Sequence, residues 1–332
     1  MYVSLKDVAA RAGVSFQTAS KVLNGHSRVA SPSTRERIQR AAAELGYVPN
    51  AMARGLVRQA SVTIGVLADD FSDQAVSQFV LAAQRAAASH GHGALISSVH
   101  ADIDAELAVR KLLEYRVDGI LVAAPSLEDE PQLGDALRGP LPVVSINRIH
   151  GGGVPLIGSD HALTGTLAAQ HLLDLGHRRI GTVIGPRGRQ VVRRRTRGFR
   201  DTLRAAGRPL PERRIAEADW TYDGGWAATH RLLDTDPAIT AVFVQNDVMA
   251  MGALKALHER GLRLPADCSV VGCDDLSFAA YLVPPLTTVR IPFEETGERA
   301  ATLLLDRIGG KQIPTRNLLP VELVVRESTT SP

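Results

Sequence analysis

Polar residues directly follow short apolar runs at four places along the chain. Asn246–Asp247 come after ITAVFVQ, Asp274–Asp275 after SVVGC, Asn147–Arg148 after PVVSI, and the loop Asp69–Asp73 after VTIGVLA. Carboxylate, amide and guanidinium groups can each engage two neighbouring hydroxyls at once. When such runs are parallel strands, these groups lie at the carboxyl ends of a sheet, where open α/β proteins bind their ligands. The pattern therefore predicts a site for a small polyhydroxylated molecule.

The elements around these residues alternate along most of the chain. Between residues 61 and 332, strand-like runs such as GILVAA and RIGTVIG alternate with longer helical segments. This alternation predicts parallel sheets covered by helices on both faces. A length of 332 residues is too great for one compact core and predicts more than one domain.

The composition excludes several classes of protein. With 45% hydrophobic and 22% charged residues, the chain is expected to be a soluble globular protein, neither disordered nor fibrous. It has no apolar run long enough to cross a bilayer and no apolar N-terminal signal, so we predict a cytoplasmic protein with no membrane partner. The cysteines, Cys268 and Cys273, have no second pair to complete a metal site and are predicted to be buried reduced thiols. We predict neither a metal ion nor a cofactor.

The basic residues are concentrated at the N-terminus. Residues 1–59 contain nine Lys or Arg and three Asp or Glu, a net charge of +6, which leaves −3 for the rest of the chain. A basic head on a slightly acidic body is typical of a module that docks on phosphates. The charge alone leaves open an ordinary solvated surface.

The pattern of residues 1–48 predicts three short helices around one small core. Ser4 and Asp7 form a capping box before a helix that ends near Ala12. After the turn at Gly13, Ser15 caps a second helix, residues 16–23, and Ser31–Pro32 starts a third that ends at Gly46. This is the pattern of a helix-turn-helix DNA-binding domain, whose second helix fits the major groove.

The second helix leaves Phe16, Gln17 and Lys21 on its outer side, and we predict that these three read bases directly. Glutamine can pair with adenine, lysine favours the acceptors of guanine, and phenylalanine can touch the thymine methyl. Helix ends and loops of the head are expected to reach phosphates. Capping is the alternative use of several of these hydroxyls. The residues assigned to phosphates are Ser4, Ser15, Thr18, Ser20, Asn24, His26, Ser33, Thr34 and Arg35.

The segments LKDVAARAGVSFQTASKVLNG and ELGYVPNAMARGL resemble the lactose repressor (LacI/GalR) family of bacterial regulators, and the likeness continues through nearly the whole chain. The resemblance implies a repressor that binds a palindromic operator as a homodimer and is switched by a small molecule. It also implies a two-lobed core similar to a periplasmic binding protein. The N-lobe would take residues of about 61–160 and 291–320, and the C-lobe about 161–290 and 321–332, with three crossings between them.

Residues 49–60 resemble the hinge helix of that family. The resemblance implies that Asn50, Ala53 and Leu56 enter the minor groove, with Leu56 wedged into the central base step. A segment this short is marginal as a helix in water, so we expect it to be helical only on operator DNA. A plain interdomain linker is the alternative.

The resemblance also implies a set of effector-binding residues, which come from both expected lobes. Trp220 offers a flat apolar face, and with polar groups around it this favours a carbohydrate, a mono- or disaccharide. Core packing is the alternative for Trp220 and for the two phenylalanines of the set. Asn147 stands where the family more often has aspartate, and Ile291 replaces a polar residue of the lactose repressor. The eight residues are Asp73, Phe79, Asn147, Arg195, Trp220, Asn246, Asp274 and Phe293.

Two other functions are alternatives to this one. An enzyme on the same fold is disfavoured because the chain has no GxGxxG after the first core strand, no GxxxxGK[ST] and no HExxH. A regulator that needs a purine corepressor stays open, although Asp73 and Asp69–Asp70 suit a sugar better. The run Arg193–Arg195 with Arg197 raises a phosphorylated sugar as an option, but a solvated helix face explains the extra arginines.

Overall fold

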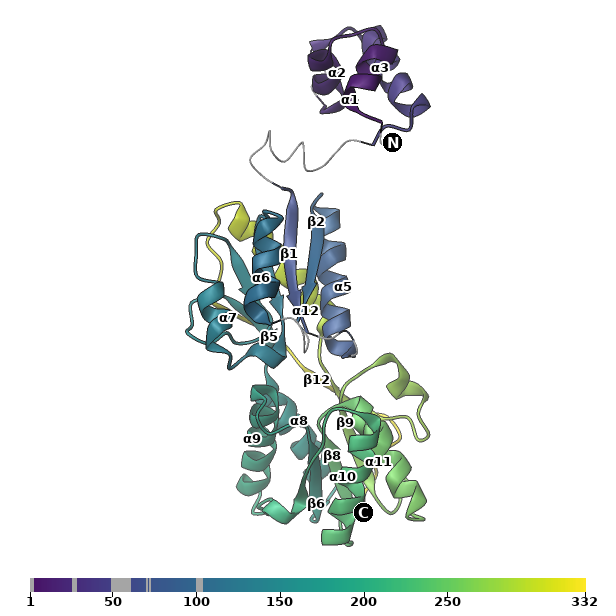
Figure 1. Ribbon diagram of the computed structural model, residues 1–332. Coiled ribbons are helices and arrows are strands. Elements are labelled where there is room, and N and C mark those ends of the chain that lie inside the picture. Colours follow the sequence, from purple (N-terminus) through teal and green to yellow (C-terminus); the bar gives the residue numbers. More distant parts are fainter. Residues whose placement is uncertain (1–2, 26–28, 49–60, 70, 72, 100–103) are drawn as a thin grey trace. The chain divides into compact units, whose positions relative to one another are not determined.

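The computed structural model describes residues 3–25, 29–48, 61–69, 71, 73–99 and 104–332 (Figure 1). It divides into two compact units, Met1–Val62 and Thr63–Pro332. We call the first the head and the second the core, and we describe each by itself. No helix among the described residues is long and apolar enough to cross a membrane.

The head contains the three helices that the sequence predicts: α1 (Leu5–Arg11), α2 (Phe16–Leu23) and α3 (Pro32–Glu44). Each begins with a serine whose hydroxyl accepts a backbone N–H of the first turn. Their inner faces share one apolar cluster that includes Val8, Ala19 and Ile38. The Arg37 Nε–H donates to the carbonyl of Ala12 over 2.8 Å, which ties α3 to the end of α1.

The core is built on two six-stranded sheets. In both sheets the neighbouring strands run parallel, except that β12 is antiparallel to β10. The N-lobe sheet has the order β11 (Arg316–Leu319), β5 (Leu156–Ser159), β4 (Val143–Ser145), β3 (Gly119–Ala123), β1 (Thr63–Ala68), β2 (Gly93–Ser98). The C-lobe sheet has the order β12 (Glu322–Val324), β10 (Thr287–Arg290), β9 (Ser269–Asp274), β8 (Ala241–Val244), β6 (Ile180–Ile184), β7 (Ile215–Glu217).

Helices cover both faces of each sheet (Figure 1). Because side chains alternate along a strand, Val66 packs with α5 (Gln74–Ser89) and α12 (Phe293–Ile308), while its neighbour Leu67 packs with α6 (Ala105–Glu114) and α7 (Pro131–Ala136). In the C-lobe, Phe243 faces the helices α8 (His161–Asp174) and α9 (Gln190–Ala205), while Val242 and Val244 face α10 (Tyr222–Thr235) and α11 (Asp247–Glu259). The predicted fold class, a helical head with a two-sheet parallel α/β core, is confirmed.

The chain passes between the two sheets three times. It leaves the N-lobe sheet after β5, returns from β10 through α12 to β11, and enters the C-lobe again at β12. Two of these crossings meet in the C-lobe, because Arg290 at the end of β10 pairs in register with Glu322 at the start of β12.

Close approach of α8 and α9 requires glycine. A Cβ built on Gly165 would lie 2.0 Å from the carbonyl oxygen of Arg195, and one on Gly198 would lie 1.9 Å from the carbonyl oxygen of Ala162. The two glycines therefore let α9 approach α8 and bring the Arg195 side chain against the sheet. Cys268 and Cys273 are free and buried, as predicted.

Candidate nucleic-acid interface and effector site

The outer face of α2 carries the three residues predicted to read bases. Phe16, Gln17 and Lys21 are exposed, and Phe16 is 50% exposed although it is a large aromatic side chain. Ala19 and Val22, on the opposite side of the same helix, are buried in the head core. An exposed aromatic next to an amide and an ammonium group is a set of contacts suited to base edges in the major groove.

The hydroxyls near the helix ends are used within the head. The Asp7 carboxylate accepts the Ser4 N–H (2.8 Å) and the Ser4 hydroxyl (2.7 Å), and these bonds hold the pKa of Asp7 below its usual range. The Ser15 hydroxyl accepts the Thr18 N–H over 3.1 Å. The Ser20 hydroxyl accepts from the Asn24 amide over 3.3 Å. Capping is therefore the use that the structure shows, and a phosphate contact by the same groups stays a prediction.

Four of the predicted DNA-contacting residues lie outside the described residues: His26, Asn50, Ala53 and Leu56. The hinge that contains the last three stays a prediction.

In the core, most of the predicted effector residues stand at the carboxyl ends of strands. Asp73 caps α5 after β1, and Asn246 caps α11 after β8. Asp274 is the last residue of β9, and Trp220 follows β7. Arg195 comes instead from the middle of α9. Sheet topology thus places residues that are far apart in sequence at the edge where parallel sheets bind ligands.

Arg195 and Asp274 form a buried ion pair. The Arg195 Nη2 atom lies 3.1 Å from Asp274 Oδ1, and the residues are 4% and 8% exposed. Arg195 Nη1 also donates to the carbonyl of Gln245. Burial raises the pKa of Asp274 to about 6, although the guanidinium of Arg195 acts in the opposite direction. Asp73 raises the same pKa, so it lies close enough to Asp274 for their charges to interact.

Two members of this network keep a buried polar atom without a hydrogen-bond partner among the described residues. These atoms are Arg195 Nε, a donor, and Gln245 Oε1, an acceptor. Nδ1 of His161 also has no hydrogen-bond partner among the described residues. Burial lowers the pKa of His161 to about 3, and the charge of Arg195 adds to this effect. Buried polar atoms normally have partners, so an unpaired donor and an unpaired acceptor next to an ion pair fit a polar ligand or bound water.

Trp220 precedes β8 in the sequence and Asn246 follows it, and a hydrogen bond joins the two residues. The Asn246 Nδ2 atom donates to the Trp220 carbonyl over 3.4 Å, and its Oδ1 accepts the Met249 N–H over 2.8 Å. The Trp220 indole lies against Gly185, where an added Cβ would come within 2.3 Å of the ring. Trp220 is half-buried and packs at the edge of both C-lobe apolar clusters, so its core and ligand roles are compatible.

For the three other predicted residues, the structure shows packing or hydrogen bonds to other parts of the core. Phe79 and Phe293 pack edge to face, with ring centroids 5.2 Å apart, as expected of helix residues in an apolar cluster. Asn147 is buried, and its amide accepts the Ala124 N–H (3.2 Å) and donates to the Arg148 carbonyl (3.3 Å). No hydrogen bond or ion pair among the described residues joins Asn147 to the Arg195–Asp274 pair, and its ligand role stays a prediction.

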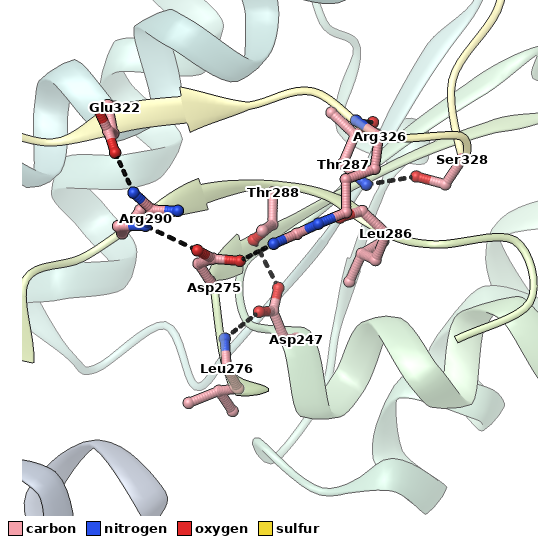
Figure 2. Close-up of polar contacts among 10 residues, drawn as sticks. All are labelled: Asp247, Asp275, Leu276, Leu286, Thr287, Thr288, Arg290, Glu322, Arg326 and Ser328. Carbon is pink, nitrogen blue, oxygen red and sulfur yellow. Dashed lines mark hydrogen bonds and ion pairs between the residues drawn. The ribbon is translucent and has the colours of Figure 1, made fainter. Parts of the chain in front are cut away.

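Two of the strand-end residues that the sequence predicted for ligand hydroxyls, Asp247 and Asp275, have their carboxylates bound within the C-lobe instead, in a polar network beside the site (Figure 2). Asp247 is fully buried and accepts the Leu276 N–H (2.8 Å) and the Thr288 hydroxyl (2.7 Å). Burial raises its pKa well above the usual value, and Asp274 adds to this. Asp275 accepts from Arg290 and Arg326. The adjacent aspartates in the sequence were the signal for this network, but the two arginine partners of Asp275 follow it by 15 and 51 residues.

Comparison with known proteins identifies the family of the chain and the kind of domain in each unit. Residues 4–50 match the family described as "Bacterial regulatory proteins, lacI family", and residues 169–329 match a "Periplasmic binding protein-like domain". The HTH-type transcriptional regulator CelR of Thermobifida fusca is 37% identical over 98% of both chains. The chain belongs to the LacI family. It is a DNA-binding transcriptional repressor with an effector-binding domain, and not an enzyme.

Two solved structures of this family match nearly the whole chain. The Lac repressor dimer bound to operator and the anti-inducer ONPF has a TM-score of 0.91 at 34% identity, covering 99% of this chain and 100% of that one. A complex of the transcriptional regulator CelR with cellobiose has a TM-score of 0.75 at 36% identity, covering 98% and 99%. The LacI-family assignment is therefore independent of any one motif.

Proposed function

We propose that this LacI-family repressor is released from a roughly palindromic operator by a mono- or disaccharide, with cellobiose as the first candidate. One observation carries the proposal: the buried Arg195–Asp274 pair stands beside Asn246 and Trp220 at the carboxyl ends of the C-lobe strands. The similar regulator CelR has been solved with cellobiose.

The chemistry of the site favours a sugar. Asp274 can accept two hydroxyls, and the unpaired Arg195 Nε and Gln245 Oε1 add one donor and one acceptor. The Trp220 indole supplies an apolar face for the C–H groups of a pyranose ring. A purine corepressor is the alternative, but a buried carboxylate suits several hydroxyls better than the few polar edges of a purine.

The head would read the operator through Phe16, Gln17 and Lys21 on α2. Leu56, in the hinge, would open a central base step in the minor groove. Opening a step costs on the order of a few kcal/mol, which extra contacts to bent DNA offset. Leu56→Ala is therefore expected to weaken operator binding while leaving sugar binding unchanged.

Homodimers would form in part through an apolar surface of the C-lobe. Tyr281 and Val283 are 84% and 92% exposed, beside a groove lined by Met251, Leu254 and Leu282. Exposed apolar side chains gathered at a groove mark an interaction surface. The relative solved on operator is a dimer. Val283→Asp is expected to shift the molecular mass in light scattering from dimer to monomer, with wild-type circular dichroism. A monomer already present in the wild type at micromolar concentration would contradict this assembly.

A titration of operator with and without sugar tests the function. The operator is first selected from random duplexes, and its dissociation constant is then measured by anisotropy. Cellobiose is expected to weaken binding by about a hundredfold, equivalent to a coupling of about 2.7 kcal/mol. A matched variant, Trp220→Leu, keeps an apolar side chain and should lose most of the response. Tighter binding with a purine such as hypoxanthine would favour the corepressor alternative, and equal affinity for selected and random duplexes would refute the repressor.

A further inference from the structure

Two neighbouring carboxylates, Asp274 and Asp275, are bound to different parts of the C-lobe. Asp274 pairs with Arg195 of α9 in the effector site. Asp275 accepts from Arg290 Nε over 2.7 Å and from Arg326 Nη2 over 2.6 Å (Figure 2). The Asp275 side chain is 8% exposed, so its two charged hydrogen bonds are largely protected from water.

The two arginine partners of Asp275 lie where two of the three crossings between the lobes leave or enter the C-lobe sheet. Arg290 is the last residue of β10, and the chain reaches α12, which packs on the N-lobe sheet, three residues later. Arg290 also forms an ion pair with Glu322, where the chain comes back from β11. Arg326 follows β12, and its Nη1 donates to the Leu286 carbonyl just before β10. Asp275 thus holds the C-lobe ends of both crossings.

The backbone at the two aspartates is unusual. Asp274 has φ 117° and Asp275 has φ 57°, in a region that residues other than glycine rarely adopt. Such conformations persist when the surrounding contacts hold them, and they are common in switch regions. On the far side, Leu276 donates its N–H to the buried Asp247, which also accepts from Thr288 of β10 (Figure 2). The short segment 274–276 is therefore held at each residue by a different partner.

We propose that Asp275 is a positioning residue that transmits the state of Asp274 in the effector site to the two crossings at Arg290 and Glu322. A ligand that replaces the Arg195 contact changes the forces on Asp274. Because the next peptide unit is held in a strained conformation, Asp275 moves with Asp274, and its two arginines carry the movement to β10 and β12. This inference deepens the proposed function and rests on it for the identity of the ligand.

The chain offers a conservative way to break the link. Asn tolerates positive φ at least as well as Asp does, so Asp275→Asn keeps the backbone and shape while removing the charge that bridges two guanidinium groups. Arg290→Gln cuts the same link from the crossing, at a less buried position. Arg263→Gln is the matched control, because it removes an exposed ion pair with Asp267 elsewhere in the C-lobe.

Hydrogen exchange of the full chain without ligand tests the transmission directly. Asp274→Asn is expected to speed exchange in the peptides 286–292 and 320–326 by at least about threefold beyond any change in β6. In an Asp275→Asn or Arg290→Gln background, adding Asp274→Asn should produce no further rise in these peptides, a non-additive result. An unchanged rate in the crossings after Asp274→Asn, or the same rise in all backgrounds including Arg263→Gln, would overturn the proposal.

A second measurement uses cellobiose and the selected operator. A Trp226→Phe background leaves Trp220 as the one tryptophan, so its fluorescence reports cellobiose binding. Asp275→Asn should bind cellobiose and operator separately with wild-type affinities, but the sugar-induced loss of operator affinity should fall at least about tenfold. A full sugar response in Asp275→Asn and Arg290→Gln would refute the positioning role. A wild type that binds no cellobiose would instead refute the proposed ligand and leave the exchange result to decide this inference.

Discussion

The head and the C-lobe arrange their functional residues in opposite ways. On α2, Phe16, Gln17 and Lys21 are exposed, and the helix is held by the buried Ala19 and Val22 behind them. In the C-lobe, Arg195 and Asp274 are buried and are each other's partners.

In the head, the residues that bind are not the residues that stabilise the fold. In the C-lobe, the same residues do both. A side chain that waits in water for DNA makes little contribution to folding, so the head can change its base preference without losing its structure. A buried charge must be compensated before the ligand arrives, so residues of the effector site also determine whether the C-lobe is stable.

The largest expected effect comes from breaking the buried pair. Asp274→Ala should lower the free energy of unfolding of the core by about 3 to 5 kcal/mol, because it leaves the guanidinium of Arg195 buried without its counter-ion. Arg195→Ala should cost less, since the remaining carboxyl can take up a proton whereas arginine cannot lose one. Urea unfolding followed by circular dichroism measures both. If both substitutions lowered the free energy of unfolding by less than about 0.5 kcal/mol, the effector-site residues would contribute as little to stability as the exposed residues of α2, and the contrast would be wrong.

The matching change in the head should act on DNA alone. Lys21→Ala is expected to weaken binding to the selected operator by about 1 to 3 kcal/mol and to relax the preference at one base pair. The thermal unfolding of the head should stay unchanged because Lys21 is exposed. Binding to competitor operators with each base substitution measures the preference. A loss that is uniform over all sequences would mean that Lys21 contacts phosphate.

The pH dependence of stability provides a smaller test of the buried site. The folded-state pKa of Asp274, about 6, lies above the usual 3.8. The folded state therefore holds the proton more tightly, and the stability that this group contributes below its unfolded pKa is lost as the pH rises through about 6. Arg195, Asp247 and Asp73 are the charged groups that act on it.

Relative to Asp274→Asn, the wild type should lose on the order of 1 kcal/mol of stability between about pH 5 and about pH 7.5. Parallel urea titrations of the two proteins measure the difference. A difference that stays constant over this range, or that grows in favour of the wild type, would mean that Asp274 is already ionised at the lower pH.

The smallest expected effect concerns a cap of the head. Ser15→Ala should destabilise the head by about 0.5 to 1 kcal/mol, because the Thr18 N–H loses its acceptor. Operator affinity should fall no further than this loss of folded head explains. A larger fall, with unchanged melting of the head, would show that the Ser15 hydroxyl also contacts a phosphate.

Local patterns predicted most of the fold. The capping box at Ser4 and Asp7, the cap at Ser15 and the Pro32 start of α3 each involve residues within one turn, so the sequence contains the whole interaction. The parallel sheets follow from alternation alone, because each apolar strand must be covered on both faces. The family likeness added the two lobes, which periodicity could not provide.

The site was predicted less completely than the fold. The expectation that polar residues after apolar runs lie at the carboxyl ends of strands placed Asn246 and Asp274 correctly in the fold. The hydrogen bond from Ala124 to Asn147 could not be predicted, because it involves a loop whose path no local pattern specifies. The arginine run on α9 shows the same limit. Gly165 and Gly198 bring Arg195 close to the sheet, while Arg197 is exposed.

What the sequence by itself determined is therefore the set of elements, their caps and the kind of residues at strand ends, since these depend on neighbours in the chain. Tertiary structure decided which charges meet. Arg195 and Asp274 are 79 residues apart, and Asp275 and Arg326 are 51 apart. The order β12-β10-β9-β8 and the packing of α9 bring them into contact. The pairing of buried charges depends on distance and on the exclusion of water, and both exist only after the sheets have assembled.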